Sequence, residues 1–273
     1  MFLDALNDCF ERRRSLIAFN VQNVYHLNAL IEVTDKLGLP CIAQCSARFV
    51  SQFEKQHGMA RIVDRYQNER IHFHLDHCQD LQLIKFCVDS GFRGVMFDGS
   101  AMPLQENILQ TKQVMKFAAE SNCVVEAELG EIGGVEDGVG TEEMCYANLD
   151  EVRMFVDETG VQLLALGIGN AHGFYKSLKQ IDTSILIKAK EIIGRKQLFV
   201  LHGGSGLPEE TVQETIEAGV VKINYSTQLK QATNDGIASY LASKKLFNEI
   251  AFEKAIHDHV KPMFESLIQR FTS

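Results

Sequence analysis

Short apolar runs alternate with longer stretches in which apolar residues recur every three or four positions, from one end of the chain to the other. The short runs are typical of buried strands, and the longer stretches are typical of helices with one buried face. Eight runs are predicted to be strands, at residues 15–20, 41–46, 71–76, 94–98, 124–129, 163–168, 198–202 and 221–225. Helices are predicted between them, among others at 81–90, 103–121, 150–159, 181–193 and 208–218.

Eight strand-helix units in 273 residues predict one α/β domain, a single closed (β/α)8 TIM barrel that covers residues 1–273. A helical extension is expected from about Gln228 onward, with a break at Pro262. An open doubly wound sheet is the alternative. No GxGxxG follows the first strand, and the glycines at 203–206 come only after the seventh, so the barrel is favoured.

The composition, with 45% hydrophobic and 23% charged residues, is that of an ordinary globular protein. A net charge of −9 and the lack of a basic stripe argue against a nucleic-acid partner. No apolar stretch reaches about 20 residues and the first residues do not resemble a secretory signal, so we expect no membrane partner and a cytoplasmic location. The seven cysteines form no CxxC pair and are interpreted as reduced thiols.

Polar residues stand where the predicted strands end, which is the face of a barrel that carries the chemistry. They are Asn20, Ser46, Asp76, His77, Asp98, Glu126, Glu128, His172, His202, Ser205, Asn224 and Ser226. The barrel would bring these side chains together at one mouth.

Three histidines, His77, His172 and His202, follow the third, sixth and seventh predicted strands. Their wide spacing fits no local zinc-finger pattern, but it suits a catalytic metal held by three ligands from distant elements, with one position open. The alternative is three independent structural histidines. His72 and His74 lie below the end of the third strand and are interpreted as structural.

Carboxylates accompany these histidines. Strand alternation predicts that Asp76 projects differently from His77, close enough to pass a proton to a metal-bound substrate without being a ligand. Glu126 and Glu128 share one strand face, so either could be a metal partner, and the alternative for Glu126 is a buried ion pair. Five glycines at 130–140 predict a mobile lid that brings in a carboxylate, or else an acidic surface loop.

A phosphate site is predicted where the seventh and eighth strands end. Backbone N–H groups beside the glycines at 203, 204 and 206, a serine hydroxyl, the hydroxyl of Thr227, and a helix that begins at Pro208 form an anion cradle. Phosphate sites after strands seven and eight recur in this fold.

These segments resemble the class II, zinc-dependent ketose-bisphosphate aldolases, which act on fructose- or tagatose-1,6-bisphosphate. The matching segments are AFN at 18–20, HLDH at 74–77, FDGS at 97–100, VEAELG at 125–130, GGVED at 133–137, GNAHG at 169–173, LHG at 201–203 and KIN at 222–224. The resemblance covers nearly the whole chain, and its ordered motifs are highly specific. It implies cleavage of the ketose to dihydroxyacetone phosphate and glyceraldehyde 3-phosphate through a metal-stabilised enediolate.

The resemblance also implies the role of each residue. His77, His172 and His202 would hold Zn²⁺, with Glu128 at an alternative metal position and Asp98 in the surroundings of the metal. Asp76 would be the acid/base at the C4 hydroxyl, and Glu136 the base that deprotonates dihydroxyacetone phosphate. The substrate and its phosphate, with a Na⁺ or K⁺ ion beside it, would contact Asn20, Ser46, Gly173, Gly203, Gly204, Ser205, Asn224, Ser226 and Thr227. A homodimer or homotetramer is expected.

Two departures and two alternatives accompany this resemblance. Residues 224–227 read NYST, where fructose-bisphosphate members commonly read Asn-x-Asp-Thr, which favours tagatose-like or divergent specificity. Arg48 stands near a position where relatives usually carry a small residue. It either modifies the phosphate pocket or only lies on the surface of the following helix. The alternatives are a Schiff-base aldolase that uses Lys222 and a non-catalytic or partner-dependent barrel subunit.

Overall fold

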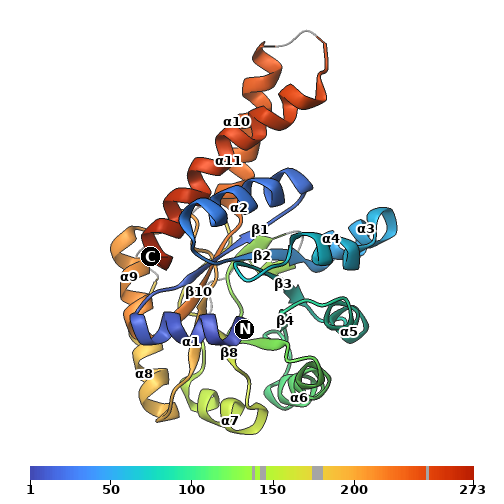
Figure 1. Ribbon diagram of the computed structural model, residues 1–273. Helices are drawn as coiled ribbons and strands as arrows, with labels where there is room; N and C mark the ends of the chain where they lie inside the picture. The colour runs from blue at the N-terminus through green and yellow to red at the C-terminus, as the bar shows by residue number, and fades with distance from the viewer. Residues whose placement is uncertain (137–138, 142–145, 174–180, 244–245) are drawn as a thin grey trace.

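Eight parallel strands close into a barrel in the computed structural model, which describes residues 1–136, 139–141, 146–173, 181–243 and 246–273 (Figure 1). The order around the barrel is β1-β10-β9-β8-β5-β4-β3-β2. The strands are β1 (Leu16–Asn20), β2 (Cys41–Ser46), β3 (Ile71–Cys78), β4 (Gly94–Phe97), β5 (Val124–Leu129), β8 (Leu163–Leu166), β9 (Leu198–Leu201) and β10 (Val220–Tyr225). The predicted fold class is confirmed, and each predicted strand is found within about two residues.

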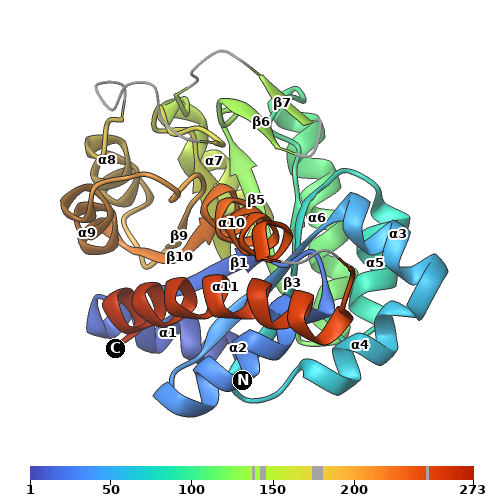
Figure 2. The same ribbon diagram turned by 90° about the horizontal axis from the view of Figure 1, so that it is seen from above.

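Helices surround the strands on the outside of the barrel (Figures 1 and 2). They are α1 (Phe2–Arg12), α2 (Val24–Leu37), α3 (Ala47–His57), α4 (Met59–Tyr66), α5 (Leu81–Asp89), α6 (Leu104–Glu120), α7 (Leu149–Thr159), α8 (Ser184–Ile193), α9 (Glu209–Ala218), α10 (Thr227–Ser243) and α11 (Glu249–Thr272). The five predicted helices are all present. None of the helices in the described part of the chain is both long and apolar enough to cross a membrane.

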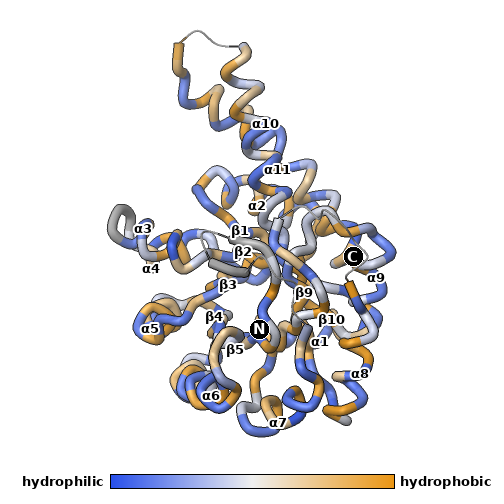
Figure 3. The backbone as a smooth tube through the Cα atoms, turned by 180° about the vertical axis from the view of Figure 1, so that it is seen from behind, coloured by the Kyte–Doolittle hydropathy of each residue, from blue (hydrophilic) through white to orange (hydrophobic). Residues whose placement is uncertain are grey.

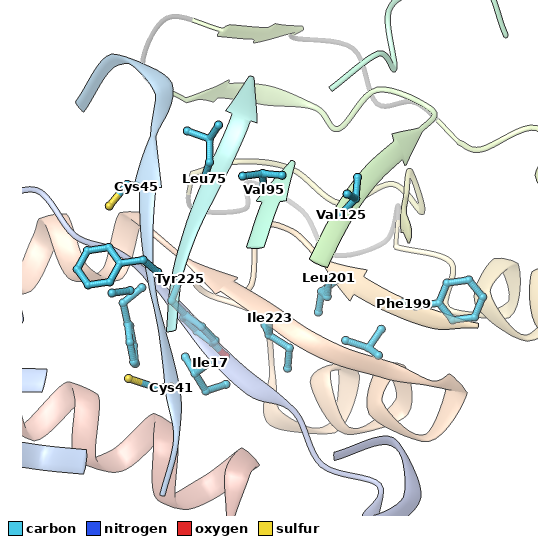
Figure 4. Close-up of a cluster of buried hydrophobic side chains, with 14 of the residues drawn as sticks. Ile17, Cys41, Cys45, Leu75, Val95, Val125, Phe199, Leu201, Ile223 and Tyr225 are labelled. Carbon is cyan, nitrogen blue, oxygen red and sulfur yellow. The ribbon is translucent and has the colours of Figure 1, made fainter. Parts of the chain in front are cut away.

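The apolar core forms two layers. The outward side chains of the strands, such as Ile17, Val125 and Phe199, pack in the large cluster between strands and helices (Figure 4). A smaller cluster fills the base of the barrel, where α1 inserts Phe2 and Leu6 beside Leu16 and its neighbours. Burying this apolar surface is the main source of stability in such a fold.

Inside the barrel the side chains change from apolar at the base to polar at the mouth. On β1, Leu16 and Ala18 belong to the base cluster, and Asn20 ends the strand. On β5, Val124 belongs to the same cluster, and Glu126 and Glu128 follow at alternate positions. Because alternate residues of a strand share a face, each strand carries its last inward side chains to the mouth.

The segment predicted as a glycine-rich lid contains a short antiparallel hairpin, β6 (Gly134–Glu136) and β7 (Val139–Thr141), which lies beyond β5 at the periphery (Figure 2). Its base is fixed to the segment after β8. The His172 N–H donates to the Gly133 carbonyl (2.7 Å), and the Gly133 N–H donates to the Asn170 carbonyl (3.2 Å). Residues 137 and 138 lie outside the described residues.

The break predicted at Pro262 is wrong, because α11 continues through this residue. Proline removes one helical N–H and crowds the carbonyl four residues earlier. Here Pro262 and Asp258 are both exposed, so water can reach that carbonyl. Val260 and Phe264 are fully buried on either side, and their packing keeps the helix continuous.

Helices α10 and α11 form a pair that projects from the barrel (Figures 1 and 3). Near its outer end four apolar side chains are exposed, namely Leu241, Leu246, Phe247 and Ile250. The other end of α11 is tied to the barrel, since the Ser15 N–H donates to the Phe271 carbonyl and the Thr272 hydroxyl donates to the Ser15 carbonyl. The predicted C-terminal helical extension is therefore present as this pair.

A buried histidine makes the stability of this fold sensitive to acid. His26 joins α2 to α10 through Thr233 (2.9 Å), and burial lowers the pKa of its imidazole to about 4. Between about pH 6.5 and 4 the unfolded chain binds a proton at this residue that the folded protein does not. Stability is therefore complete above about pH 6.5 and falls with pH, by up to about 1.4 kcal/mol per pH unit for this one group.

We expect a lower midpoint of thermal unfolding at pH 5 than at pH 7, and a shallower dependence in His26→Gln, which keeps a donor and an acceptor. Differential scanning calorimetry on both proteins at the two values measures this. Identical pH dependence in variant and parent would remove His26 as a source of the acid sensitivity.

Candidate active site

Three imidazoles meet at the mouth of the barrel. His77 belongs to β3, His202 directly follows β9, and His172 lies in the segment after β8. Their ring centroids are 4.6 Å apart for His77 and His202, 5.0 Å for His77 and His172, and 6.0 Å for His172 and His202. One ring nitrogen of each lies within 4.8 Å of those of the other two, which is a spacing that a single metal ion can bridge.

The backbone at His77 explains why the side chains of Asp76 and His77 both lie at the mouth of the barrel. His77 has φ of 37°, a left-handed conformation that costs a non-glycine residue free energy, and the pairing of β3 with β4 shifts register between Leu75 and Cys78. Regular alternation would place the two side chains on opposite faces. Instead, His77 Nε2 lies 4.0 Å from Asp76 Oδ1, so the two residues adjoin one another.

Carboxylates orient two of the three histidines. Asp98 Oδ2 lies 2.8 Å from His77 Nδ1, and Glu126 Oε1 lies 2.7 Å from His202 Nε2. An ionised carboxylate only accepts, so these two nitrogens carry hydrogens. The remaining nitrogens, His77 Nε2 and His202 Nδ1, then face each other at 2.9 Å. Two lone pairs at this distance repel unless a proton or a cation lies between them, so the donor set fits a metal ion.

The charges around His77 favour a cation. Burial opposes a charge on this ring, but the carboxylates of Asp76 and Asp98 outweigh it and raise the pKa of His77 well above its usual value. Burial lowers the pKa of His202 to about 4, against the hydrogen bond to Glu126, which raises it. Burial, together with the charge of Asp98, raises the pKa of Glu128 well above its usual value. A bound cation would relieve this excess of negative charge.

Glu128 forms a second group of possible ligands with His77 and Asp98, whose ligand atoms all lie within 4.8 Å of one another. Its Oε1 accepts a hydrogen bond from the Ile132 N–H (3.2 Å), and its side chain is almost fully buried. The position is compatible with the alternative metal site expected for Glu128. Asp98 belongs to this second group, contacts His77 of the first, and also accepts from the Ser100 hydroxyl (2.7 Å).

Glu126 is the centre of a buried polar network. Besides His202, Lys222 Nζ lies 2.8 Å from Glu126 Oε2 and His74 Nε2 lies 3.2 Å from it, and all four side chains are inaccessible to solvent. Burial alone would raise the pKa of Glu126, but the charge of Lys222 and the two histidine contacts lower it well below its usual value. Glu126 thus combines a buried ion pair with support of a candidate metal ligand.

Two amide side chains hold Asp76, and a third amide holds one of these two. Asn20 Nδ2 donates to Asp76 Oδ2 (2.8 Å), Asn224 Nδ2 donates to Oδ1 (3.4 Å), and Gln44 Nε2 donates to Asn20 Oδ1 (2.9 Å). Asn20 and Asn224 were expected to touch substrate, and the structure places them against Asp76. Gln44 was not predicted from the sequence. Alternation could have revealed it, because Gln44 lies two residues before Ser46, the predicted mouth residue of the same strand, and so shares its face.

A small hollow joins most of the predicted phosphate residues. It is lined by His172, Gly173, Gly203, Ser205, Asn224, Ser226 and Thr227. Gly173 and Gly203 have φ of 100° and 71°, which only glycine adopts at little cost, and α10 begins at Thr227, so its N-terminus adjoins the hollow. The buried hydroxyl of Ser226 and the Oδ1 atom of Asn224 have no partner within the described structure.

Three predicted substrate residues, Asn20, Ser46 and Gly204, are not among the residues that line the hollow. The Gly204 N–H donates to the Asn224 carbonyl (2.9 Å), and a Cβ at this position would lie 2.7 Å from Ile223, so Gly204 serves packing and is not among the hollow's lining residues. The Ser46 hydroxyl caps α3 and accepts from the Phe49 N–H (3.3 Å), while its Cα pairs in register with Asp76. Glu136 ends β6, and its side chain is outside the described part of the structure.

The fold and the site together define an enzyme of the (β/α)8 class, with candidate metal ligands beside an anion-binding hollow at the C-terminal face of the barrel. The chain belongs to the class-II fructose-bisphosphate aldolase family, whose family model matches residues 2–273. It is therefore a class II aldolase, a lyase.

Solved structures of aldolases resemble the chain over its whole length. The YdjI aldolase from Escherichia coli K12 is 25% identical, with a TM-score of 0.82 over 99% of this chain and 96% of that one. A fructose-bisphosphate aldolase from Campylobacter jejuni is 18% identical, with a TM-score of 0.79 over 97% and 93% of the two chains. At that lower identity the likeness concerns the fold alone.

Replacement of Asp98 tests its support of His77. Asp98→Asn removes the charge that holds the His77 Nδ1–H, so we expect the affinity for zinc to fall about 10- to 100-fold. Competition with a chromogenic chelator measures this without reference to turnover.

Asp80→Asn is the matched control for this substitution. Asp80 caps α5 through two backbone N–H groups, and asparagine caps equally well, so this variant should bind zinc like the parent. Equal zinc affinity in all three proteins would show that Asp98 does not support a metal ligand.

Proposed function

We propose that this enzyme catalyses the zinc-dependent aldol cleavage and condensation of a ketose 1,6-bisphosphate, with dihydroxyacetone phosphate and glyceraldehyde 3-phosphate as the products of cleavage. The observation that carries the proposal is the convergence of His77, His172 and His202 beside the buried Asp76 and the anion hollow. Family membership supports the reaction type.

The three imidazoles would hold Zn²⁺, with the group around Glu128 as an alternative position. Neutral imidazoles suit this purpose because they leave the charge of the metal unquenched. When bound, the zinc supplies a Lewis acid that stabilises negative charge on substrate oxygens. Asp98 and Glu126 keep His77 and His202 in the tautomers that the site needs.

Asp76 would move the proton of the C4 hydroxyl when the C3–C4 bond breaks or forms. Its two oxygens accept from the amides of Asn20 and Asn224, which fix the direction of the carboxylate. Asp76 is almost fully buried, so bulk water does not compete for the proton.

Glu136 would move the proton at C3 of dihydroxyacetone phosphate. The backbone bonds between Gly133 and the segment of His172 anchor the hairpin three residues before Glu136, which supports a place near the mouth. The hairpin can then carry a carboxylate toward the substrate while its base stays fixed.

The phosphate that both bisphosphates share would occupy the hollow, where glycine N–H groups, hydroxyls and the α10 N-terminus can donate. The unpartnered Asn224 Oδ1 is an acceptor suited to a Na⁺ or K⁺ ion beside that phosphate. The sequence NYST at 224–227 favours tagatose-1,6-bisphosphate or a divergent ketose over fructose-1,6-bisphosphate.

A Schiff-base mechanism at Lys222 is disfavoured, because its ammonium is fully buried and paired with Glu126. A homodimer or homotetramer belongs to the proposal, and the exposed apolar residues of the α10–α11 pair support it. Six cysteines of the described structure are buried free thiols, which agrees with the proposed cytoplasmic location.

The central experiment measures cleavage of fructose- and tagatose-1,6-bisphosphate side by side, before EDTA treatment, after it, and after zinc is restored. We expect activity that disappears with EDTA and returns with zinc, since the imidazoles need the metal. The ratio of the two rates shows whether fructose- or tagatose-1,6-bisphosphate is the preferred substrate. Activity indifferent to chelation would contradict the metal mechanism, and no activity on either sugar would redirect the search to another phosphorylated ketose or to a required partner subunit.

A second experiment isolates Glu136. Glu136→Gln should keep zinc and substrate binding but slow the exchange of the C3 proton of dihydroxyacetone phosphate with D₂O by roughly 100-fold or more, because the base is lost. Glu131→Gln, an equal change five residues earlier, serves as the control. Exchange at the parental rate in Glu136→Gln would exclude Glu136 as the base.

A further inference from the structure

Arg48 is a basic residue that lies two positions after the end of β2, at the mouth of the barrel. Among the three residues that follow each of the eight barrel strands, all of them described, Arg48 is the one lysine or arginine. Its side chain is exposed, and within the described structure no hydrogen bond or ion pair engages its guanidinium. An arginine free of partners at the mouth of a site that binds anions is available to a ligand.

The barrel places Arg48 across the mouth from the phosphate hollow. The hollow is formed by residues after β8, β9 and β10, and in the ring of eight strands β2 stands opposite β8. Ser46, the last residue of β2, pairs with Asp76 on β3, and Arg48 follows two residues later. A substrate whose phosphate lies in the hollow and whose C4 hydroxyl meets Asp76 therefore extends toward Arg48.

The orientation of α3 favours this contact. Helical side chains tilt toward the N-terminus of their helix, and the N-terminus of α3 is the end that joins β2 at the mouth. Arg48 also stands next to Phe49 and one turn before Gln52, and these two residues of α3 line a cavity.

That cavity, about 560 Å³, is large enough for the far half of a sugar substrate, and its walls are uncharged. They consist of Gln22, Asn23, Val24, Tyr25, Phe49, Gln52, Phe53 and Ile62. Amides and aromatic rings can contact hydroxyls and carbon chains, but they do not neutralise an anion. Asp76 and Asp98 at the mouth would repel one, and Arg48, directly before Phe49 of the cavity wall, offers a compensating positive charge.

We propose that Arg48 pairs with an anionic group, a phosphate or a carboxylate, at the far end of the aldehyde half of the substrate. This specificity role rests on the proposed aldolase function. The guanidinium forms charge-assisted hydrogen bonds with that group, which makes a charged aldehyde a better acceptor than an uncharged one. Arg48 therefore determines the class of aldehyde, while the metal site and Asp76 act on any of them.

The test compares three aldehydes in condensation with dihydroxyacetone phosphate: glyceraldehyde 3-phosphate, succinic semialdehyde and uncharged glyceraldehyde. In Arg48→Gln we expect kcat/KM for the preferred charged aldehyde to fall about 10- to 100-fold, while kcat/KM for glyceraldehyde stays within twofold. Arg48→Lys should recover part of the loss. The charged aldehyde whose kcat/KM falls more in Arg48→Gln shows whether Arg48 pairs with a phosphate or with a carboxylate.

Arg153→Gln, which removes an exposed guanidinium from α7, is the control for the change in net charge. Exchange of the C3 proton of dihydroxyacetone phosphate with D₂O, which needs no aldehyde, is measured on every preparation. No exchange in the parent enzyme would overturn the proposed function itself. If exchange is normal, an equal fall of kcat/KM for all three aldehydes in Arg48→Gln would overturn the role of Arg48. An unchanged kcat/KM for all three would overturn it as well.

Discussion

The buried carboxylate of Glu126 is the interaction on which the site depends. It receives contacts from Lys222, His74 and His202 in the interior of the barrel, where an unpaired charge would cost several kcal/mol. The lysine and the two imidazoles compensate that charge, and the contact to His202 fixes which ring nitrogen faces the mouth. The structural ion pair with Lys222 and the orientation of His202 thus depend on the two oxygens of one carboxylate. The polar layer rests on an apolar base closed by α1, which keeps the network away from water on that side.

The chemistry at the mouth is divided between two sides of the ring. Residues after β8, β9 and β10 form the anion hollow, and β1, β2 and β3 supply Asn20, Gln44 and Asp76. His77 and His202 bridge the two sides. This division separates recognition of a constant part of the substrate from recognition of a variable part, so one side can change in evolution while the other keeps the reaction.

Much of the fold and of the site was predictable because both depend on short-range pattern. Apolar runs marked the strands, and polar residues at their ends marked the mouth, because parallel strands direct all their carboxyl ends to one face. The relation of Asp76 to His77 was not predictable from alternation, since it depends on the left-handed backbone at His77. The pairing of His74 with Glu126 depends on register between strands, which periodicity along one strand does not contain. The continuity of α11 through Pro262 depends on tertiary packing that outweighs a local preference.

The backbone conformation of His77 links the candidate metal site to the folding stability of the protein. A left-handed backbone at a residue other than glycine is tolerated only where its surroundings hold it, and here those surroundings are Asp98 and the neighbouring imidazoles. Selection for stability alone would replace this residue with glycine or asparagine, which adopt the conformation more readily. The histidine at this position is therefore a trade-off, in which the barrel gives up part of its folding free energy to place one ring nitrogen at the mouth.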